Sequence, residues 1–208
     1  MGYEETLFTV LRSGNELDLR DPDPDAVNFD DIVGNLASIT RYVGSQQNVA
    51  QHCLYVADHL RDQDTSRAVQ LHGLLHDAQE AYLGDVPRPT KNLDSSFEST
   101  LDQYEEKVLK AIYKALRLEP PSSTVRQRVK QADTEVALIE LHVLGTESVL
   151  SQTVDRFPGW TQEKARELID RTDWWQERNW DEDGENAGSL FRKRFNELTG
   201  NERPAVPC

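Results

Sequence analysis

The sequence predicts an all-α fold that carries a small β-hairpin near its N-terminus. Long stretches place apolar residues at helical spacing, and they are separated by glycine and proline residues, which end helices. The opening stretch LFTVLRSGNELDL instead alternates apolar residues around Ser13-Gly14-Asn15, a pattern typical of a short hairpin over about 5–20. Because an isolated two-stranded hairpin is only marginally stable, we expect it to pack on the helices.

Helices account for the rest of the predicted chain. The first is capped by Asn28 or Asp30 and ends near Arg41. Others are expected over about 47–61, 66–82, 95–116 and 123–150, from about Thr161, and around Leu190 to Leu198. An acidic loop is expected from Asp181. Since no break divides the pattern, we expect one domain over 1–208, with a core over about 28–150 and a C-terminal helical extension over 151–200.

The composition restricts the partners and the compartment. The chain has 37 acidic and 23 basic residues and a net charge of −14, which argues against a polymeric nucleic acid as partner. No apolar run approaches the roughly 20 residues of a membrane span, and no leader opens the chain. The two cysteines, Cys53 and Cys208, cannot form a disulfide framework. We therefore expect a cytoplasmic protein that does not act at a membrane.

Side chains of the types that bind metals occur in three of the expected helices. They are His52 in NVAQHCLYVADHL, the pair His76-Asp77 in LHGLLHDAQEAYL, and Asp133 in VKQADTEVALIELHVL. Each lies beside or within an apolar stripe, where an uncompensated carboxylate is costly. Buried hydrogen bonds alone are one interpretation of this set. The other is one divalent metal ion, since two imidazoles and two carboxylates leave positions open for water and substrate.

The order of these four residues resembles that of the HD-domain metal-dependent phosphohydrolase superfamily. The segment HDAQEAYLGDVPRPTK is similar to the branch that contains the bacterial 5′-deoxynucleotidase, and the resemblance covers about residues 15–145. It implies an HD-domain helical bundle in which His52, His76, Asp77 and Asp133 hold one divalent metal ion. Related enzymes use cobalt, manganese, nickel, zinc, iron or magnesium.

The same resemblance implies roles for five further residues. Glu80 would orient the ligands or handle a proton, and Asp85 would help to activate or position the attacking water. Arg41 would grip the substrate phosphate, for which a planar guanidinium offers two prongs, and Lys91 would be a further phosphate contact. Tyr42 replaces a tryptophan that favours the deoxy sugar in the relative, so selectivity for deoxynucleotides does not follow. The alternative for these residues is a structural role as helical, turn or surface groups.

Together these features favour a metal-dependent phosphohydrolase with a small-molecule nucleotide substrate. The first choice is a (deoxy)nucleoside 5′-monophosphate, cleaved to nucleoside and phosphate. One alternative is a (deoxy)nucleoside triphosphate that loses tripolyphosphate, and another is a non-catalytic nucleotide-sensing module with a structural metal. Alarmone hydrolases carry a second acid after the motif glutamate, where this chain has Ala81, and the Gly-Tyr-Pro motif of cyclic-dinucleotide phosphodiesterases is absent. Relatives often form homo-oligomers, dimers or larger, but the sequence does not fix the oligomeric state of this chain.

Overall fold

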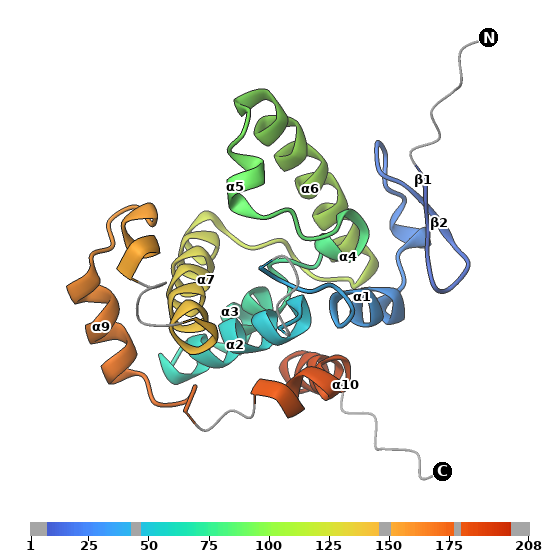
Figure 1. Cartoon of the computed structure of the whole chain (residues 1–208). Helices are drawn as coiled ribbons and strands as arrows, with labels where there is room; N and C mark the ends of the chain where they lie inside the picture. The colour runs from blue at the N-terminus through green and yellow to red at the C-terminus, as the bar shows by residue number, and fades with distance from the viewer. Residues whose placement is uncertain (1–7, 43–46, 146–150, 177–179, 201–208) are drawn as a thin grey trace.

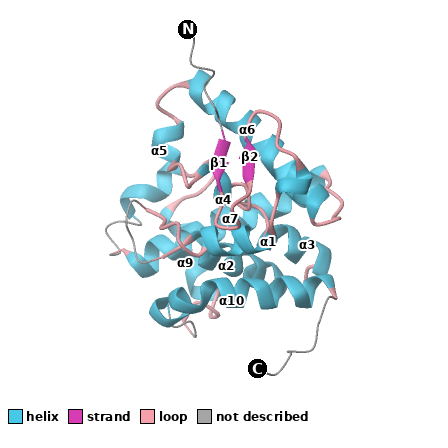
Figure 2. Cartoon of the chain, turned by 90° about the vertical axis from the view of Figure 1, so that its right-hand side faces the viewer, coloured by secondary structure: helices cyan, strands magenta, loops and turns pink. Residues whose placement is uncertain are grey.

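The computed structural model describes residues 8–42, 47–145, 151–176 and 180–200, and it is mostly helical (Figure 1). Strands β1 (Phe8–Val10) and β2 (Glu16–Asp18) pair antiparallel, with Phe8 opposite Asp18 (Figure 2). Leu11 and Leu17 are buried in the helical core, so the hairpin packs on the helices as expected. The predicted all-α fold with an N-terminal hairpin is confirmed. Within the described ranges no helix has the length and apolar character that a bilayer span requires.

Seven of the described helical elements begin at a residue whose side chain accepts a hydrogen bond from a free amide of the first turn. Asn48 forms a capping box with Gln51, and the other side-chain caps are Asp23, Asn28, Ser66, Asp94, Ser122 and Thr161. The helical elements are η1 (Pro24–Ala26), α1 (Phe29–Leu36), α2 (Val49–Asp62), α3 (Arg67–Leu74), α4 (Glu80–Leu83), α5 (Arg88–Lys91), α6 (Ser95–Ala115), α7 (Ser123–Leu144), η2 (Val154–Arg156), α9 (Gln162–Arg171) and α10 (Trp180–Thr199).

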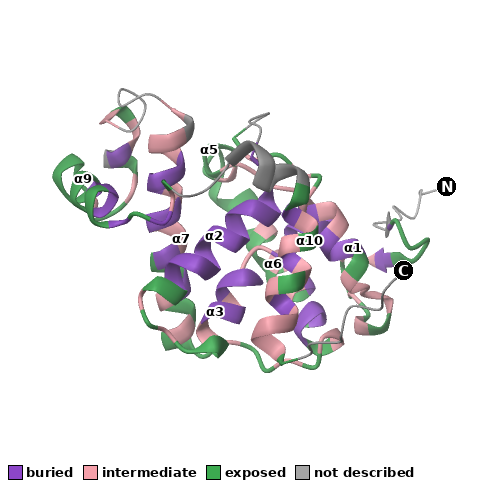
Figure 3. Cartoon of the chain, turned by 90° about the horizontal axis from the view of Figure 1, so that it is seen from below, coloured by how far each residue is buried: buried purple, intermediate pink, exposed green. Residues whose placement is uncertain are grey.

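Helix α2 is the centre of the molecule and is buried along residues 49–60 (Figure 3). It packs against α3, α7 and α10. One of its faces, which includes Cys53 and Ala57, joins a hydrophobic cluster with α1, α3, α6 and α10. Other residues of the helix, Tyr55, Val56 and Leu60, join a second cluster with α7 and α9. Since helix α2 is enclosed by apolar groups, any polar side chain on it must find its partners inside the protein.

The prediction of one continuous helix over 66–82 is wrong. The helix stops after Leu74, and residues 75–79 form turns that precede α4. Amides in this stretch bond to carbonyls three residues back, as Ala78 does to Leu75 (3.1 Å). Leu75, Ala78 and Ala81 are all buried, and a spacing of three fits both an α-helix and these tighter turns. The apolar pattern therefore could not show where the helix ends.

Two other expectations about the elements are also wrong. Helix α1 ends at Leu36, because the chain around Arg41 pairs with the start of α2: the Arg41 amide donates to the Gln47 carbonyl (2.8 Å), and Thr40 bridges Asn48. The acidic stretch from Asp181 lies in the first turns of α10, where the helix dipole favours acidic residues. Part of the long helix predicted over 123–150 lies outside the described residues, since α7 is described to Leu144.

Candidate metal centre

Four predicted ligands from three parts of the fold converge on one point. Helix α2 contributes His52, the turn between α3 and α4 contributes His76 and Asp77, and α7 contributes Asp133. The Asp133 Oδ1 atom lies 3.0 Å from His52 Nε2 and 3.7 Å from His76 Nε2. The Asp77 Oδ2 atom lies 3.1 Å from His76 Nε2 and 3.8 Å from His52 Nε2. One ligand atom from each of His52, His76 and Asp77 falls within 4.8 Å of the others.

Hydrogen bonds on the far side of each imidazole turn its Nε2 atom towards this point. The Nδ1 atom of His52 donates to Glu140 Oε1 (2.8 Å), and that of His76 donates to the Gly73 carbonyl (2.8 Å). With its proton on Nδ1, a neutral imidazole presents a lone pair at Nε2. The Nε2 atoms of both rings face carboxylate oxygens, and the buried His76 Nε2 has no hydrogen-bond partner among the described residues. The donor set thus fits a divalent cation, which would take the place of a proton at these nitrogens.

The pKa shifts of His76 and Asp77 also indicate that this site stabilises positive charge. Burial disfavours the charged form of His76, yet the Asp77 charge and the adjacent Asp133 carboxylate raise its pKa well above the ordinary value. Burial also disfavours ionised Asp77, but the neighbouring His76 and His52 lower its pKa to about 2. Burial opposes ionisation of Asp133 as well, but hydrogen bonds from His52 and His76 lower its pKa well below the ordinary value. Both carboxylates therefore remain ionised and can attract a cation.

Glu140 is a functional candidate that the sequence interpretation missed. It is fully buried on α7, and besides His52 it accepts hydrogen bonds from Gln47 Nε2 (2.6 Å) and the Tyr42 hydroxyl (2.8 Å). A carboxylate behind a ligating histidine fixes the ring and raises the basicity of its other nitrogen. Its position seven residues after Asp133 offered a signal, because two helical turns place both side chains on the same face of α7.

We call the four candidate metal ligands His52, His76, Asp77 and Asp133 the metal cluster. Arg41 lies between this cluster and Glu140. Its side chain is 12% exposed, with Nη1 3.8 Å from Asp77 Oδ2 and Nη2 3.5 Å from Glu140 Oε2. Burial opposes its charge, but the carboxylates of Glu140 and Asp77 raise its pKa, so it stays cationic. The next residue, Tyr42, has a left-handed backbone (φ 50°), and its ring lies 5.2 Å from the Arg41 guanidinium. A bulky residue in this strained conformation is uncommon and is often found at functional sites.

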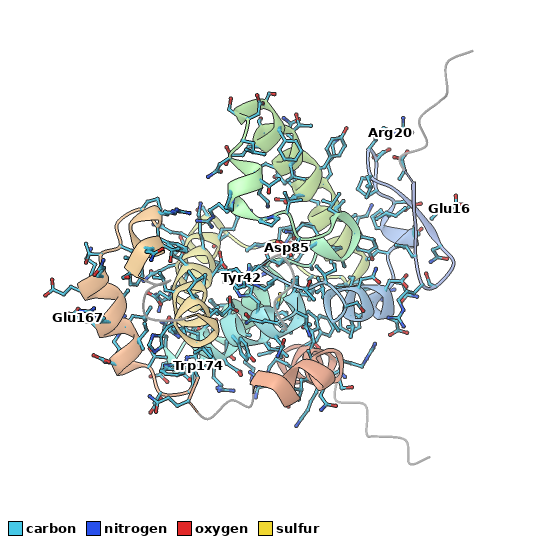
Figure 4. All side chains as sticks on the ribbon, viewed as in Figure 1. Glu16, Arg20, Tyr42, Asp85, Glu167 and Trp174 are labelled. Carbon is cyan, nitrogen blue, oxygen red and sulfur yellow. The ribbon has the colours of Figure 1, made fainter. Side chains whose placement is uncertain are left out.

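The two predicted catalytic acids occupy different environments beside the cluster. Glu80 begins α4 and is buried, and burial together with the charges of Asp77 and Asp85 raises its pKa to about 10. It is therefore a neutral acid at pH 7. Asp85 is partly exposed, and partial burial raises its pKa despite the attraction of Arg41. Tyr42 and Asp85 both lie near the middle of the molecule, whereas Glu16 and Glu167 lie at its periphery (Figure 4).

Two cavities extend from the cluster, on either side of Asp133. We call the first the α5–α7 cavity; it measures about 510 Å³ and is lined by Arg41, Tyr42, Asp85, Arg88, Asp133 and Phe157, among others. The second, the α6–α7 cavity, measures about 540 Å³ and is lined by His72, His76, Asp77, Tyr113, Arg126 and Asp133, among others. Both reach a metal-ligand candidate, so both are accessible to a substrate bound at the cluster.

Lys91 is not brought to the cluster in the way that Arg41 is. Its ammonium group pairs with Glu105 Oε1 of α6 at 2.7 Å, and it is not among the residues that line the α5–α7 cavity. The cation of the same proline-rich segment that does line this cavity is Arg88. Phosphate binding by Lys91 remains a prediction.

Comparison with known proteins agrees with the arrangement of these residues. A family model described as 5′-deoxynucleotidase YfbR-like matches residues 29–142, more than half of the chain, and this range contains His52, His76, Asp77 and Asp133. The chain belongs to the 5′-deoxynucleotidase YfbR-like family. The predicted membership of the HD-domain phosphohydrolases is thereby confirmed, and the family description indicates a hydrolase that acts on nucleotides.

Two curated proteins are also similar to this YfbR-like chain. An uncharacterized protein from Rhodobacter capsulatus is 31% identical over 140 residues, which cover 62% of this chain and 69% of that protein. YfdR from Escherichia coli K12 is 34% identical over 129 residues, which cover 58% of this chain and 66% of YfdR. The family match ends before η2, α9 and α10, so Phe157 and the rest of that segment lie beyond it.

Proposed function

We propose that this chain is a divalent-metal-dependent phosphohydrolase that cleaves nucleoside or deoxynucleoside 5′-monophosphates to nucleoside and phosphate. The observation that carries this proposal is the convergence of two imidazole Nε2 atoms and two carboxylates at one enclosed point beside a cationic arginine. Membership of the YfbR-like family supports the same reaction class.

The metal ion would be held by His52, His76, Asp77 and Asp133. When bound, such an ion supplies positive charge that polarises a phosphoryl oxygen and lowers the pKa of a water molecule. Nitrogen and oxygen ligands of this kind are compatible with cobalt, manganese, nickel, zinc, iron or magnesium.

The protein's own groups would position the phosphate and move the protons. Arg41 is held in place by Asp77 and Glu140, and its guanidinium remains able to donate to phosphate oxygens. Asp85, whose pKa is raised, is suited to accept a proton from the attacking water. Glu80 carries a proton at pH 7, and we assign it the delivery of a proton to the departing 5′ oxygen.

The charges around the α6–α7 cavity favour a monophosphate over a triphosphate. Apart from the metal-ligand candidates, its charged lining consists of the acids Asp102, Glu105 and Glu106 and the bases Lys110, Arg126 and Lys130. These charges balance, so this cavity offers no excess of positive charge to a tripolyphosphate tail. The α5–α7 cavity is lined by Arg41, Arg88 and Arg156 against Asp85 and Asp133, and a triphosphate substrate is therefore kept as the second candidate.

The assay that tests the proposal uses metal-stripped protein to which manganese or cobalt is restored. Nucleoside mono- and triphosphates, in ribo and deoxy forms, are incubated with it and the products are separated by chromatography. Free phosphate and nucleoside from monophosphates are expected. Tripolyphosphate would establish the triphosphohydrolase instead, and binding without turnover under every metal would favour a nucleotide-sensing module.

A further inference from the structure

We propose that the α5–α7 cavity binds the nucleobase of the substrate and that Phe157 is the residue on which the base stacks. This inference rests on the proposed function, because it assumes a nucleotide whose phosphate lies at the metal cluster. Phe157 follows η2, outside the family match, so the contact belongs to this chain's own C-terminal segment.

The lining of this cavity combines charged groups with apolar ones. Arg41, Asp85 and Asp133 are polar groups of the metal cluster and its surroundings. The remaining lining combines an apolar set, which consists of Pro87, Pro89, Ala137, Leu141 and Phe157, with Tyr42, Arg88, Asn92, Thr134, Thr153 and Arg156. A nucleotide has the same division, with a charged phosphate at one end and a flat, largely apolar base at the other. The volume of about 510 Å³ lies within the range of small-molecule sites, roughly 300–1,000 Å³.

Phe157 offers a positioned ring with exposed surface. Its amide bonds to the Val154 carbonyl (3.0 Å), its carbonyl accepts from the Trp160 amide (3.0 Å), and its side chain packs against the second hydrophobic cluster while staying partly exposed. The Arg88 guanidinium carbon lies 5.8 Å from the centre of the ring. An aromatic ring beside a guanidinium is a sequence-tolerant platform for bases, worth about 1–3 kcal/mol per stacked base.

The α6–α7 cavity is less suited to a base. Its aromatic residue, Tyr113, is buried, and its hydroxyl hydrogen-bonds to His72 Nδ1 (2.8 Å). The two rings also pack against each other, with centres 5.5 Å apart. Tyr113 is therefore engaged with His72, whereas Phe157 keeps accessible surface.

The test compares Phe157→Ala with Phe157→Tyr in the metal-loaded enzyme. Deoxyadenosine 5′-monophosphate is the probe with a base, and 2-deoxyribose 5-phosphate is the probe without one. Phe157→Ala should raise KM for the nucleotide about 10-fold or more, an effect confined to the probe with a base, and Phe157→Tyr should restore it. Leu109→Ala, which alters the wall of the α6–α7 cavity, is the matched control and should leave KM for the nucleotide unchanged.

A binding measurement separates this inference from the proposed function. Calorimetric titration of deoxyadenosine 5′-monophosphate into metal-stripped protein should show the same loss of affinity in Phe157→Ala. If the wild type binds in this Phe157-dependent way but hydrolyses no nucleotide, the base site stands and the proposed function fails. An unchanged KM and affinity in Phe157→Ala, an equal effect on the probe without a base, or a larger effect of Leu109→Ala would overturn the base site. A wild type that neither binds nor hydrolyses the nucleotide would overturn both.

Discussion

Helices α2 and α7 hold two histidine–carboxylate clusters that differ in how their hydrogen bonds are satisfied. In the first, His59 Nδ1 accepts from Trp174 Nε1 (3.3 Å), and His59 Nε2 donates to Glu135 Oε2 (2.6 Å). Gln63 (3.0 Å) and Gln131 (2.9 Å) also donate to Glu135. One ring therefore meets one carboxylate, and both ring nitrogens and both carboxylate oxygens have partners.

The metal cluster has the same residue types on the same two helices but a different balance. His52 lies two turns before His59 on α2, and both of its ring nitrogens face carboxylates: Nε2 lies 3.0 Å from Asp133 Oδ1, and Nδ1 bonds to Glu140. His76 and Asp77 add a further ring nitrogen and a further carboxylate. An excess of buried acceptors over donors marks a site that needs a cation, whereas matched donors and acceptors mark a structural network.

Removal of a candidate metal ligand should have the largest effect, because it abolishes the property that distinguishes the metal cluster from the His59–Glu135 network. Asp77→Ala takes away one of two carboxylates that face the imidazoles, so metal binding and phosphate release should both be lost while the helical fold is kept. Metal content, hydrolysis and circular dichroism measure the three properties. Glu135→Gln changes a carboxylate of the structural network and should keep both metal and activity. Full activity in Asp77→Ala would remove the metal assignment.

Glu80→Gln should keep the metal but lower kcat by about 100-fold, the usual range for loss of a proton-transferring group. The amide has nearly the shape of the protonated acid but cannot give up a proton in the same way. The measurement is kcat under saturating nucleotide, together with the metal content of the same sample. A variant with unchanged kcat would show that Glu80 takes no part in proton transfer.

Glu140→Gln should weaken metal binding by about 10- to 100-fold, because an amide supports the His52 ring less strongly than a carboxylate. Competition titration with a chelating indicator gives the dissociation constant. Glu135→Gln is the matched control on the same helix, and its metal affinity should equal that of the wild type. Equal metal affinities in the two variants would mean that Glu140 does not act through His52.

The structural network should appear in the pH dependence of stability. Burial opposes ionisation of Glu135, but hydrogen bonds from His59, Gln131 and Gln63 lower its pKa from 4.5 to about 2. A lowered pKa stabilises the folded state above the unfolded pKa, so this contribution, roughly 3 kcal/mol, is present above pH 4.5 and is lost as the pH falls towards 2.

Urea unfolding of the wild type and of Glu135→Gln over this pH range tests whether the stabilisation by Glu135 is lost as the pH falls. The difference in unfolding free energy should be largest above about pH 5 and should shrink in acid. A difference that is independent of pH would show that the effect of Glu135 comes from packing alone.

The sequence predicted which residues converge better than it predicted the shape of the chain around them. His52, His76, Asp77 and Asp133 could be found because each places a polar group beside an apolar stripe. The end of α3 could not, since apolar residues three apart fit a helix and a tight turn equally well.

Contacts between distant segments were also beyond the sequence. Glu140 lies among apolar residues of α7, and its partners Tyr42, Gln47 and His52 come from other elements. Phe157 reaches its cavity from a segment outside the expected core, so no local pattern indicates that it is near Arg88.

The position of Glu140 connects the candidate metal site with the α5–α7 cavity. Its oxygens are shared by His52, a candidate metal ligand, and by Arg41 and Tyr42, which line that cavity. A stronger hydrogen bond to one Glu140 oxygen changes the strength of the hydrogen bonds that the other oxygen accepts. By thermodynamic reciprocity, if the ion improves nucleotide affinity by some factor, the nucleotide improves ion affinity by the same factor. Through Glu140, Tyr42 is connected to the candidate metal ligand His52 as well as to the α5–α7 cavity.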